Sequence, residues 1–413
     1  MDIYDIAVIG GGAAGTMAAI RAGQLNKNTI LIERNASIGV KILMTGAGRC
    51  NITNIAPIDV FVEKFGRQGE FLRSAFYKFS NTALIDFFES NGLKLKSERQ
   101  GRVFPSTDKA SSVVETLKKC IKESGAGILY KMELAGVKKK DGLFEALLNG
   151  GGKISAKRII LATGGVSYPA TGSKGEGLYI AKKLGHTVIP LKAALVPLRT
   201  KETWVKQLQG VSLDNIRITF LSEGKKIISG IGELMFTHFG VSGPLVLDLS
   251  GNIVALTSAH KEVKLFIDLK PGLDAAKLET RLLNDLSEKG SSQLSTIMEG
   301  LLPKKMVPVF IRVAGLNPVR KASQITQAER QLILKLLKAL PLTIEGALSI
   351  EKGMVTNGGI STKEINPRTM GSKIISGLYF AGEIIDGAAP SGGYNLQQAF
   401  STGFLAGEAA ANA

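Results

Sequence analysis

Cysteine is scarce in this sequence, with Cys50 and Cys120 as its two thiols. They are far apart and form no CxxC pair, which argues against a disulfide framework and a zinc site and favours a reducing compartment. No apolar run approaches the roughly 18 residues of a membrane-spanning helix, and no charged-then-apolar leader precedes the first expected strand. We therefore expect a cytoplasmic protein with no metal and no membrane partner.

Acidic residues are also few, with 35 Asp and Glu against 52 Lys and Arg, for a formal net charge of +17. Such a charge favours anionic partners, including nucleotides, nucleic acid and anionic membrane surfaces. The lysines are mostly scattered doublets, and the densest run, Lys138–Lys140, precedes an expected turn at Asp141-Gly142. With one Trp and few aromatics near these lysines, no base-stacking platform is apparent. The sequence therefore favours solvated surface over a nucleic-acid site, and a small-molecule substrate; the oligomeric state stays open.

The chain opens with the pattern of a β-α-β unit. A β-branched run at 4–9 leads through Gly10–Gly12 to an expected helix at 13–24 and a second buried strand at 29–32. Such a unit begins a parallel sheet. Farther along, the sequence predicts helices at 71–91, 111–124 and 176–184, and a buried strand at 158–161.

The pattern changes after Pro190. Strand-like alternation runs from Leu195 to about Leu269, and a helical stretch follows to about Leu340, in which Thr326 and Glu329 form a capping box. A small-residue helix is expected at 395–411. The predicted fold is α/β, with a Rossmann-type domain built from both chain ends and interrupted by two inserts. The expected boundaries are 1–190 plus 350–413 for this two-ended domain, 191–270 for a β-rich domain and 271–349 for a helical domain.

A glycine fingerprint, Gly10-x-Gly12-x-x-Gly15, lies between the first strand and helix. In this context the first glycine permits a tight turn, the second lets the backbone approach a pyrophosphate, and the third lets the helix pack on the strand. The helix start offers free N–H groups and partial positive charge to phosphates. Glu33, at the end of the second strand, can accept hydrogen bonds from ribose hydroxyls. This fingerprint serves NAD and FAD alike.

A second segment near the C-terminus favours FAD. A strand runs from Gly377 to Gly382-Glu383, followed by Asp386 and by Gly393-Tyr394-Asn395 at the start of the last helix. An acidic residue after such a strand can bind ribityl hydroxyls, and the helix start can direct N–H groups and positive dipole at the flavin N1–C2=O edge. The alternative is an ordinary buried strand and glycine turn, which the presence of both chain ends disfavours.

At this point the sequence resembles the BaiN-like, aminoacetone-oxidase-like family of bacterial flavoproteins over essentially its whole length. The resemblance is carried by Lys41–Asn54, Gly101–Pro105, Ala162–Gly165 with Tyr168-Pro169, Phe236–Pro244, Glu364–Met370 and Gly393–Gln397. It implies the two-ended FAD domain with a β and a helical insert, and FAD as the cofactor.

The residues expected to hold that cofactor come from the two segments and from the resemblance. The resemblance implies roles for Lys41, Gly46, Gly48, Arg49 and Asn51 along the cofactor, with the cations near the pyrophosphate, and for Thr163 and Gly164 on the adenosine side. The full expected set is Gly10, Gly12, Ala13, Ala14, Gly15, Glu33, Arg34, Lys41, Gly46, Gly48, Arg49, Asn51, Met132, Thr163, Gly164, Gly382, Glu383, Asp386, Gly393, Tyr394, Asn395 and Leu396. The sequence departs from the family pattern at 387–390 and at Gln398, so no member's substrate is carried over.

No acid or base is assigned from the sequence. Cys50 is expected to be structural or part of the cofactor shell rather than half of a redox disulfide. His238, in a family motif, is an acid–base candidate or a loop-fixing residue. No second GxGxxG follows a strand, so NAD(P)H, if it reduces the flavin, has no dedicated domain.

The sequence therefore predicts an FAD-dependent oxidoreductase that moves a hydride between a small organic substrate and flavin N5, with NAD(P)H as a candidate donor. An oxidase and an enoyl-type reductase are not separated. Two alternatives stay open: a tRNA-modifying flavoprotein, suggested by the charge, and a non-catalytic FAD-binding sensor.

Overall fold

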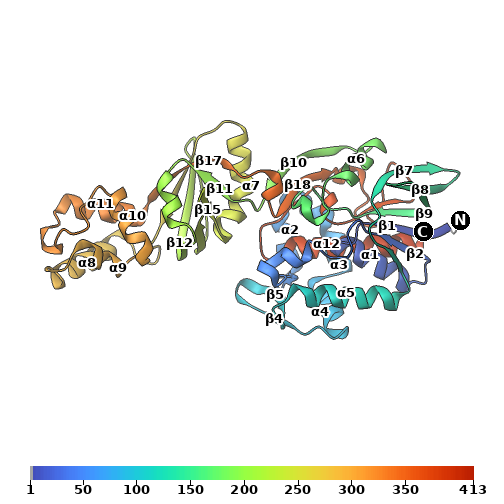
Figure 1. Ribbon diagram of the computed structural model, residues 1–413, viewed down its shortest axis with the longest axis horizontal. Coiled ribbons are helices and arrows are strands. Elements are labelled where there is room, and N and C mark those ends of the chain that lie inside the picture. The colour runs from blue at the N-terminus through green and yellow to red at the C-terminus, as the bar shows by residue number, and fades with distance from the viewer. Residues whose placement is uncertain (1–2) are drawn as a thin grey trace. The chain divides into compact units, whose positions relative to one another are not determined.

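The computed structural model describes residues 3–413, which fall into two compact units. Unit 1 joins the chain up to Ala194 with Gly353–Ala413, and unit 2 is Leu195–Lys352. Both chain ends therefore belong to one unit, as their blue and red ribbons show in Figure 1. Among the described residues no helix is both long and apolar enough to cross a bilayer.

The main sheet of unit 1 confirms the Rossmann-type fold. Its strands follow the order β6-β2-β1-β9-β8-β7, with β19 also paired to β9. The parallel strands are short apolar runs, because helices cover both faces of such a sheet. Their bounds are β1 (Ile3–Ile9), β2 (Thr29–Ile32), β6 (Gly127–Leu129), β9 (Lys153–Leu161) and β19 (Leu378–Phe380). The antiparallel hairpin of β7 (Leu134–Lys140) and β8 (Leu143–Leu148) turns at Asp141-Gly142, both with positive φ.

The first and last helices pack tightly against each other. A Cβ atom on Gly403 would lie 2.2 Å from the carbonyl oxygen of Ala14, and one on Gly407 would lie 2.4 Å from that of Ala18. The small residues of the C-terminal helix therefore let its backbone touch the N-terminal helix, which joins the two chain ends. Unit 1 contains α1 (Ala13–Gln24), α2 (Ile58–Lys64), α3 (Gly69–Lys78), α4 (Asn81–Ser90), α5 (Ala110–Ser124), α6 (Glu176–Lys183) and α12 (Tyr394–Asn412).

Two smaller sheets complete unit 1. One consists of β3 (Thr53–Asn54), β5 (Arg102–Pro105) and β4 (Leu95–Ser97), and the other of β10 (Val188–Ala194) and β18 (Val355–Ile360). The prediction of one helix over 71–91 is wrong. The chain breaks between α3 and α4, because the Ser80 hydroxyl caps α4 by accepting from Ala83 N–H (3.2 Å) and Phe79 stacks on Phe404 (4.4 Å between ring centroids).

Unit 2 is built on a seven-stranded antiparallel sheet in the order β13-β12-β14-β15-β11-β17-β16, which closes because β12 also pairs with β16. Ile216, Ile218 and Phe220 of β12 are buried inside the closed sheet, and the residues between them face outward. The strands are β11 (Leu198–Thr200), β12 (Ser212–Ser222), β13 (Lys225–Ile228), β14 (Gly232–Phe236), β15 (Gly240–Ser242), β16 (Val263–Asp268) and β17 (Leu340–Ala347).

The helices of unit 2 are α7 (Pro244–Ser258), α8 (Ala275–Glu288), α9 (Leu294–Glu299), α10 (Val307–Val313) and α11 (Gln327–Lys338). The prediction of strands throughout 195–269 is wrong at α7, whose apolar residues also suit a helix that begins with proline at its first position. The capping box of Thr326 and Glu329 at α11 is confirmed. Helices and sheet share one hydrophobic cluster, and the predicted subdivision of this unit at residue 270 stays a prediction.

Candidate cofactor site

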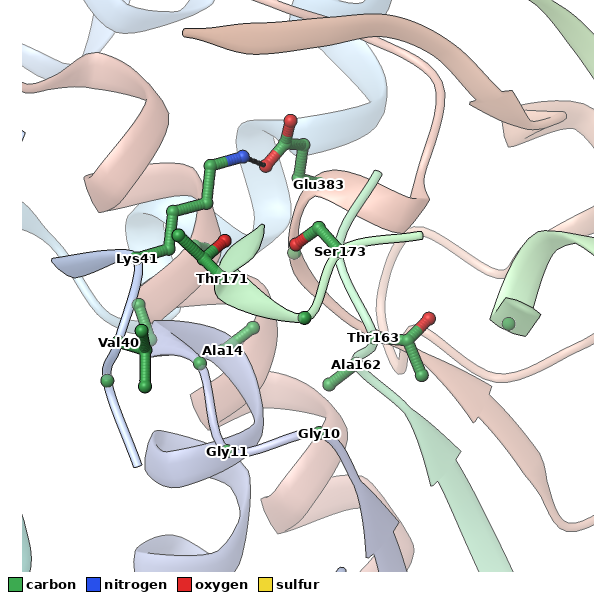
Figure 2. A pocket seen from close by; sticks show the side chains of 18 of the residues that line it. Gly10, Gly11, Ala14, Val40, Lys41, Ala162, Thr163, Thr171, Ser173 and Glu383 are labelled. Atoms are coloured by element: carbon green, nitrogen blue, oxygen red, sulfur yellow. Dashed lines mark hydrogen bonds and ion pairs between the residues drawn. The ribbon is translucent and has the colours of Figure 1, made fainter. Parts of the chain in front are cut away.

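A deep pocket lies in unit 1 at the carboxyl ends of its parallel strands, the position where α/β sheets of this kind bind ligands. It is lined by the loop between β1 and α1, by the ends of β2 and β9, by the segments 39–45 and 171–177, and by the start of α12. Figure 2 shows the glycine loop at one side of this pocket and Lys41 with Glu383 at the other. One pocket thus contains residues from both chain ends.

The three fingerprint glycines have three different surroundings. A Cβ atom on Gly10, whose φ is +102°, would lie 2.6 Å from the carbonyl oxygen of Ala162, and one on Gly15 would lie 1.8 Å from that of Gly10. Those two glycines permit the turn and the contact of helix with strand. A Cβ atom on Gly12 would meet nothing within 4 Å. The backbone at Gly12 is therefore open toward the pocket.

Two helices begin at the pocket with a glycine at the N-cap. Gly12 is the N-cap of α1 and Gly393 that of α12, and neither helix carries an acidic residue in its first turn. Ala13 and Ala14 of α1, and Asn395 and Leu396 of α12, line the pocket. Helix starts carry partial positive charge, so both ends favour anionic or electron-rich ligand atoms.

Glu33 is buried and already holds the surrounding backbone. One carboxylate oxygen accepts from Gly11 N–H (2.6 Å) and the other from Asn35 N–H (2.7 Å). The side chain is thus fixed at the end of β2, with lone pairs left for further donors. A ribose hydroxyl is a donor of that kind.

Arg34 binds the segment 171–177 at the end of the pocket where Glu33 lies. Its guanidinium is paired with Glu133 and with Glu176 (2.7 Å), and it donates to the carbonyl of Gly172 (3.0 Å). Asn35 Nδ2 donates to the carbonyl of Thr171 (3.0 Å). The glycine-rich segment therefore gains its position from the two residues that follow Glu33.

Lys41 and Glu383 form an ion pair at the other end of the pocket (Figure 2). Lys41 Nζ lies 2.6 Å from Glu383 Oε2 and 2.6 Å from the Ser167 hydroxyl, while Glu383 Oε1 accepts from that hydroxyl (2.9 Å) and from Thr356 N–H (2.7 Å). Burial favours a higher pKa for Glu383, but the Lys41 ammonium and the three hydrogen bonds outweigh it and hold the pKa below its usual value. The carboxylate therefore stays ionised.

Every charged side chain lining the pocket is engaged in this way, in a bond to backbone N–H or in an ion pair. None of them offers an unpaired acid or base. Electrostatics here fix the shape of the pocket, and the hydride chemistry depends on a bound cofactor.

The structure brings many of the predicted residues together on the pocket wall, and their contacts with the cofactor stay predictions. Those lining it are Gly10, Gly12, Ala13, Ala14, Glu33, Arg34, Lys41, Met132, Thr163, Gly164, Gly382, Glu383, Asn395 and Leu396. The side chain of Asn395 is hydrogen-bonded to the carbonyl and the N–H of Ala389 (2.8 and 2.9 Å), so its backbone is the part that can bind a ligand.

Other predicted residues lie outside the pocket lining. Arg49 is paired with Glu98 (2.9 Å) and Asp108 (3.2 Å) and covers the Phe104 ring at 4.0 Å, and its pKa is raised, mainly by the bond to Glu98. Asn51 accepts from Val103 N–H (3.2 Å). The remaining members of this group are Gly15, Gly46, Gly48, Asp386, Gly393 and Tyr394. Their contacts with the cofactor stay predictions, and the side chains of Arg49 and Asn51 bind other residues of unit 1.

Asp386 and Tyr394 pack beside α2 and α3. Asp386 accepts from Gln68 Nε2 (2.8 Å), and burial raises its pKa despite that bond. Tyr394 is buried edge-on to Phe61, with 4.9 Å between ring centroids. Gly393, whose Cβ would lie 2.3 Å from the carbonyl of Thr53, lets α12 start against this layer.

The two residues whose roles the sequence left open, Cys50 and His238, lie apart from the pocket lining. The Cys50 thiol is fully buried with a φ of +63°, and burial raises its pKa to about 12, so it is a poor nucleophile. His238 lies in unit 2, between β14 and β15. In unit 1, His186 is buried and bonded to the Ser372 hydroxyl (2.8 Å). No group of His, Cys, Asp and Glu in residues 3–413 suits a metal ion.

Further segments complete the wall and were not predicted from the sequence. They contribute Asn35, Gly39, Val40, Ile42, Thr45, Glu133, Leu134, Thr171, Gly172, Ser173, Glu176, Gly177, Met354, Val355 and Ala399. Gly387 and Gln398, where the sequence departs from the family pattern, line the pocket as well. A glycine-rich stretch at 172–177 was the available signal, since positive φ at Gly172 and Gly175 marks backbone shaped for close approach.

The residues present fit FAD. The two helix starts with glycine N-caps suit a pyrophosphate and an electron-rich ring edge, and the open backbone at Gly12 leaves room for phosphate. In addition, the buried hydroxyl oxygen of Thr163, on the pocket wall, has no hydrogen-bond partner within residues 3–413. A buried hydroxyl without a hydrogen-bond partner is rare in folded proteins, and a polar ligand would supply such a partner.

Comparisons with known proteins agree with this geometry. The family profile described as "HI0933-like protein Rossmann domain" matches residues 4–409. A 3-dehydro-bile acid delta(4,6)-reductase of Clostridium scindens is 33% identical over 408 residues, covering 98% of each chain. A ribosomal RNA dihydrouridine synthase of Haemophilus influenzae is 32% identical over 402 residues, covering 96% of each chain.

A similar fold occurs in a solved structure. The 3-ketosteroid delta1-dehydrogenase of Sterolibacterium denitrificans superposes with a TM-score of 0.55 at 13% identity, with all of both chains covered. At that identity the likeness concerns the fold.

Proposed function

Because the chain belongs to the HI0933-like family of FAD-dependent oxidoreductases, we propose that it reduces a carbon–carbon double bond conjugated to a carbonyl group. One observation carries the proposal. The names of both relatives describe the addition of hydrogen to such a bond, in a 3-oxo steroid for one and in the uracil ring of RNA for the other. Two unlike substrates thus share one polarised alkene.

The reaction balances with a donor of the NAD(P)H class. The alkene gains a hydride at the carbon β to the carbonyl and a proton at the α carbon, and NAD(P)H is oxidised to NAD(P)+. When bound, FAD supplies the two-electron hydride carrier between them.

This chain's own residues have three tasks in that reaction. The Lys41–Glu383 pair and the Ser167 hydroxyl keep one end of the pocket rigid and charged without supplying a free acid. The start of α12 turns partial positive charge toward the ligand, which favours the electron-rich reduced form. Because no unpaired acid lines the pocket, we assign the proton at the α carbon to water or to a substrate-side group.

For the substrate, RNA uracil is the class we favour. A net charge of +17 attracts a polyanion far more strongly than a single carboxylate, and one relative at 32% identity acts on ribosomal RNA by name. A 3-oxo-Δ4 steroid is the second candidate, favoured by the relative at 33% identity.

The test is anaerobic. The FAD-bound protein is reduced with NADPH or NADH, and the reduction is monitored as loss of the oxidised flavin absorbance. The reduced protein is then mixed with unmodified ribosomal RNA, a 3-oxo-Δ4 steroid or the saturated steroid. We expect reoxidation by an unsaturated acceptor with formation of the saturated product, and none by the saturated steroid. Reoxidation by oxygen alone, with neither acceptor changed, would show an oxidase and contradict the proposal.

A further inference from the structure

A groove on the outward face of the unit 2 sheet is the feature that the FAD chemistry leaves unexplained. It runs across β13, β12 and β16 and is lined by Arg217, Thr219, Lys226, Ile228, Phe266 and Asp268, among others. We refer to it as the β12 groove. It lies wholly within unit 2.

The pairing register places an apolar row across the middle of the groove. Thr219 on β12 stands opposite Ile228 on β13 and opposite Phe266 on β16, and Phe266 in turn stands opposite Pro341 on β17. Ile228 is 59% exposed. Adjacent strands lie about 4.8 Å apart, so the row is a short, largely apolar strip with an aromatic ring in it. The sheet's own core is on the other face, and this strip contributes nothing to it.

Three cations surround that row without partners. Lys226 and Lys264 both stand opposite Leu221, two residues after Thr219 on β12. Arg217 lies two residues before Thr219, on the same face of the sheet. All three side chains are exposed, and none forms an ion pair with any residue of 3–413. The groove is therefore positively charged at its rim.

The groove's carboxylate does not neutralise them. Asp268 faces Arg217 in the register but is paired with Lys338 (2.7 Å). That lysine also donates to the carbonyls of Lys270 and Leu273 (3.0 and 2.8 Å), which fixes it at the end of α11. The charges of Arg217, Lys226 and Lys264 are therefore not balanced by the carboxylate of the groove.

A largely apolar strip that contains a partly exposed aromatic ring and has unpaired cations beside it matches one ligand chemistry in particular. Single-stranded RNA offers bases that stack on aromatic and apolar surfaces, and phosphates that pair with Lys and Arg. An acidic peptide would use the cations but not the aromatic ring. We propose that the β12 groove docks a single-stranded or loop segment of the RNA substrate; this rests on the RNA substrate class proposed above.

Folding is what creates this surface. Arg217, Lys226 and Lys264 are separated by many residues and come from three strands, so the lysine pattern in the sequence looks scattered. The same holds for the aromatic ring: Phe266 stands between Leu265 and Ile267 in the chain, and meets Thr219 and Pro341 through strand pairing. The scattered lysines and the few aromatics near them are the reason that the sequence favoured solvated surface.

The test measures binding of a fluorescein-labelled, uridine-containing single-stranded RNA to the FAD-bound full-length protein, by anisotropy over a series of salt concentrations. The triple variant Arg217→Glu, Lys226→Glu, Lys264→Glu should weaken binding at least tenfold and lower the slope of log affinity against log salt by about 2, because each single-strand phosphate contact contributes about 0.7. Phe266→Leu, which keeps an apolar side chain, should weaken binding several-fold without changing that slope.

The matched control variant reverses the charge of three other exposed, unpaired lysines of the same unit and carries Lys289→Glu, Lys304→Glu and Lys335→Glu. Flavin content and melting temperature verify that every variant is folded. If both triple variants weaken RNA binding equally, general charge attraction explains the binding and the proposed docking in the β12 groove is wrong. RNA binding unaffected by the groove variants would overturn it as well. If the wild type binds no RNA, the groove and the RNA substrate both fail, whereas reduction of the steroid would still support the conjugated-alkene chemistry.

Discussion

The ammonium of Lys41 lies 2.6 Å from the carboxylate of Glu383, although the two residues are 342 positions apart in the chain. The pair joins the loop after β2 to the segment after β19, and Ser167 and Thr356 complete the network from two further segments. Four parts of unit 1 are thereby fixed around one end of the cofactor pocket.

Removing Lys41 should destabilise the protein in a pH-dependent way. Lys41→Met leaves Glu383 without its main counter-charge, so the pKa of Glu383 rises and the carboxylate is poorly accommodated at neutral pH. We expect a loss of about 2 kcal/mol at pH 7, less than for a fully buried pair because both side chains keep about a fifth of their surface exposed (22% and 19%). Urea unfolding from pH 7 down to pH 3 measures this loss of unfolding free energy.

The sign follows from the lowered pKa of Glu383 in the folded protein. Its stabilising effect is present above the unfolded value of about 4.3 and is lost as the pH falls through the folded value. The difference in unfolding free energy between wild type and Lys41→Met should therefore become smaller in acid. Lys174→Met, at an exposed lysine without an ion pair, is the control and should change little. A gap that stays constant with pH would argue against the ion pair as its cause.

Two glycine variants should separate folding from cofactor binding. Gly12→Ala adds a methyl group where no atom lies within 4 Å, so the apoprotein should unfold within about 0.5 kcal/mol of wild type, while FAD affinity falls at least tenfold because the methyl group occupies phosphate space. Gly15→Ala adds a methyl group 1.8 Å from the carbonyl oxygen of Gly10 and should cost several kcal/mol of stability. Thermal unfolding of apoprotein and titration with FAD give the two readouts. Equal FAD affinity in Gly12→Ala and wild type would count against the phosphate position.

The Cys50 thiol should be inert in the folded enzyme. Burial raises its pKa to about 12, so at pH 8 the reactive thiolate is scarcely populated. We expect no labelling by a thiol reagent in the native state, labelling of both cysteines after unfolding, and unchanged flavin reduction by NAD(P)H in Cys50→Ser. Cys120, which is also buried, serves as the internal comparison. Fast native labelling of Cys50, or loss of flavin reduction in the variant, would revive a redox role.

Stability should decrease in weak acid because of His186. Burial lowers its pKa, opposed in part by the nearby Glu364 carboxylate, so the folded protein resists protonation at this site. The unfolded chain binds the proton below about pH 6.5, and stability is lost from there down to the folded pKa, with a slope of at most about 1.4 kcal/mol per pH unit. His186→Gln should flatten this slope in urea unfolding between pH 7 and 5. His260→Gln, at an exposed turn, should leave it intact.

Much of the N-terminal unit could be predicted from local sequence. The bounds of α1 and β2 agree with the prediction, because glycine turns, β-branched runs and helical periodicity act within a few residues. The capping box at Thr326 and Glu329 is equally local. The errors also have local causes. Ser80 is a cap inside an apolar helical pattern, and the run in α7 suits a buried strand as well as a helix.

The cofactor site divides in the same way. By itself the sequence determined the glycine loop, Glu33 and the second flavin segment, since each is a short motif whose residues act through their own backbone or the next turn. Only the tertiary structure decided that Lys41 pairs with Glu383, that Arg49 holds Glu98 and Asp108, and that Arg217, Lys226 and Phe266 share one sheet face. Those relationships depend on strand register and helix packing, which arise from burial of the whole core and are written in no single stretch of the chain.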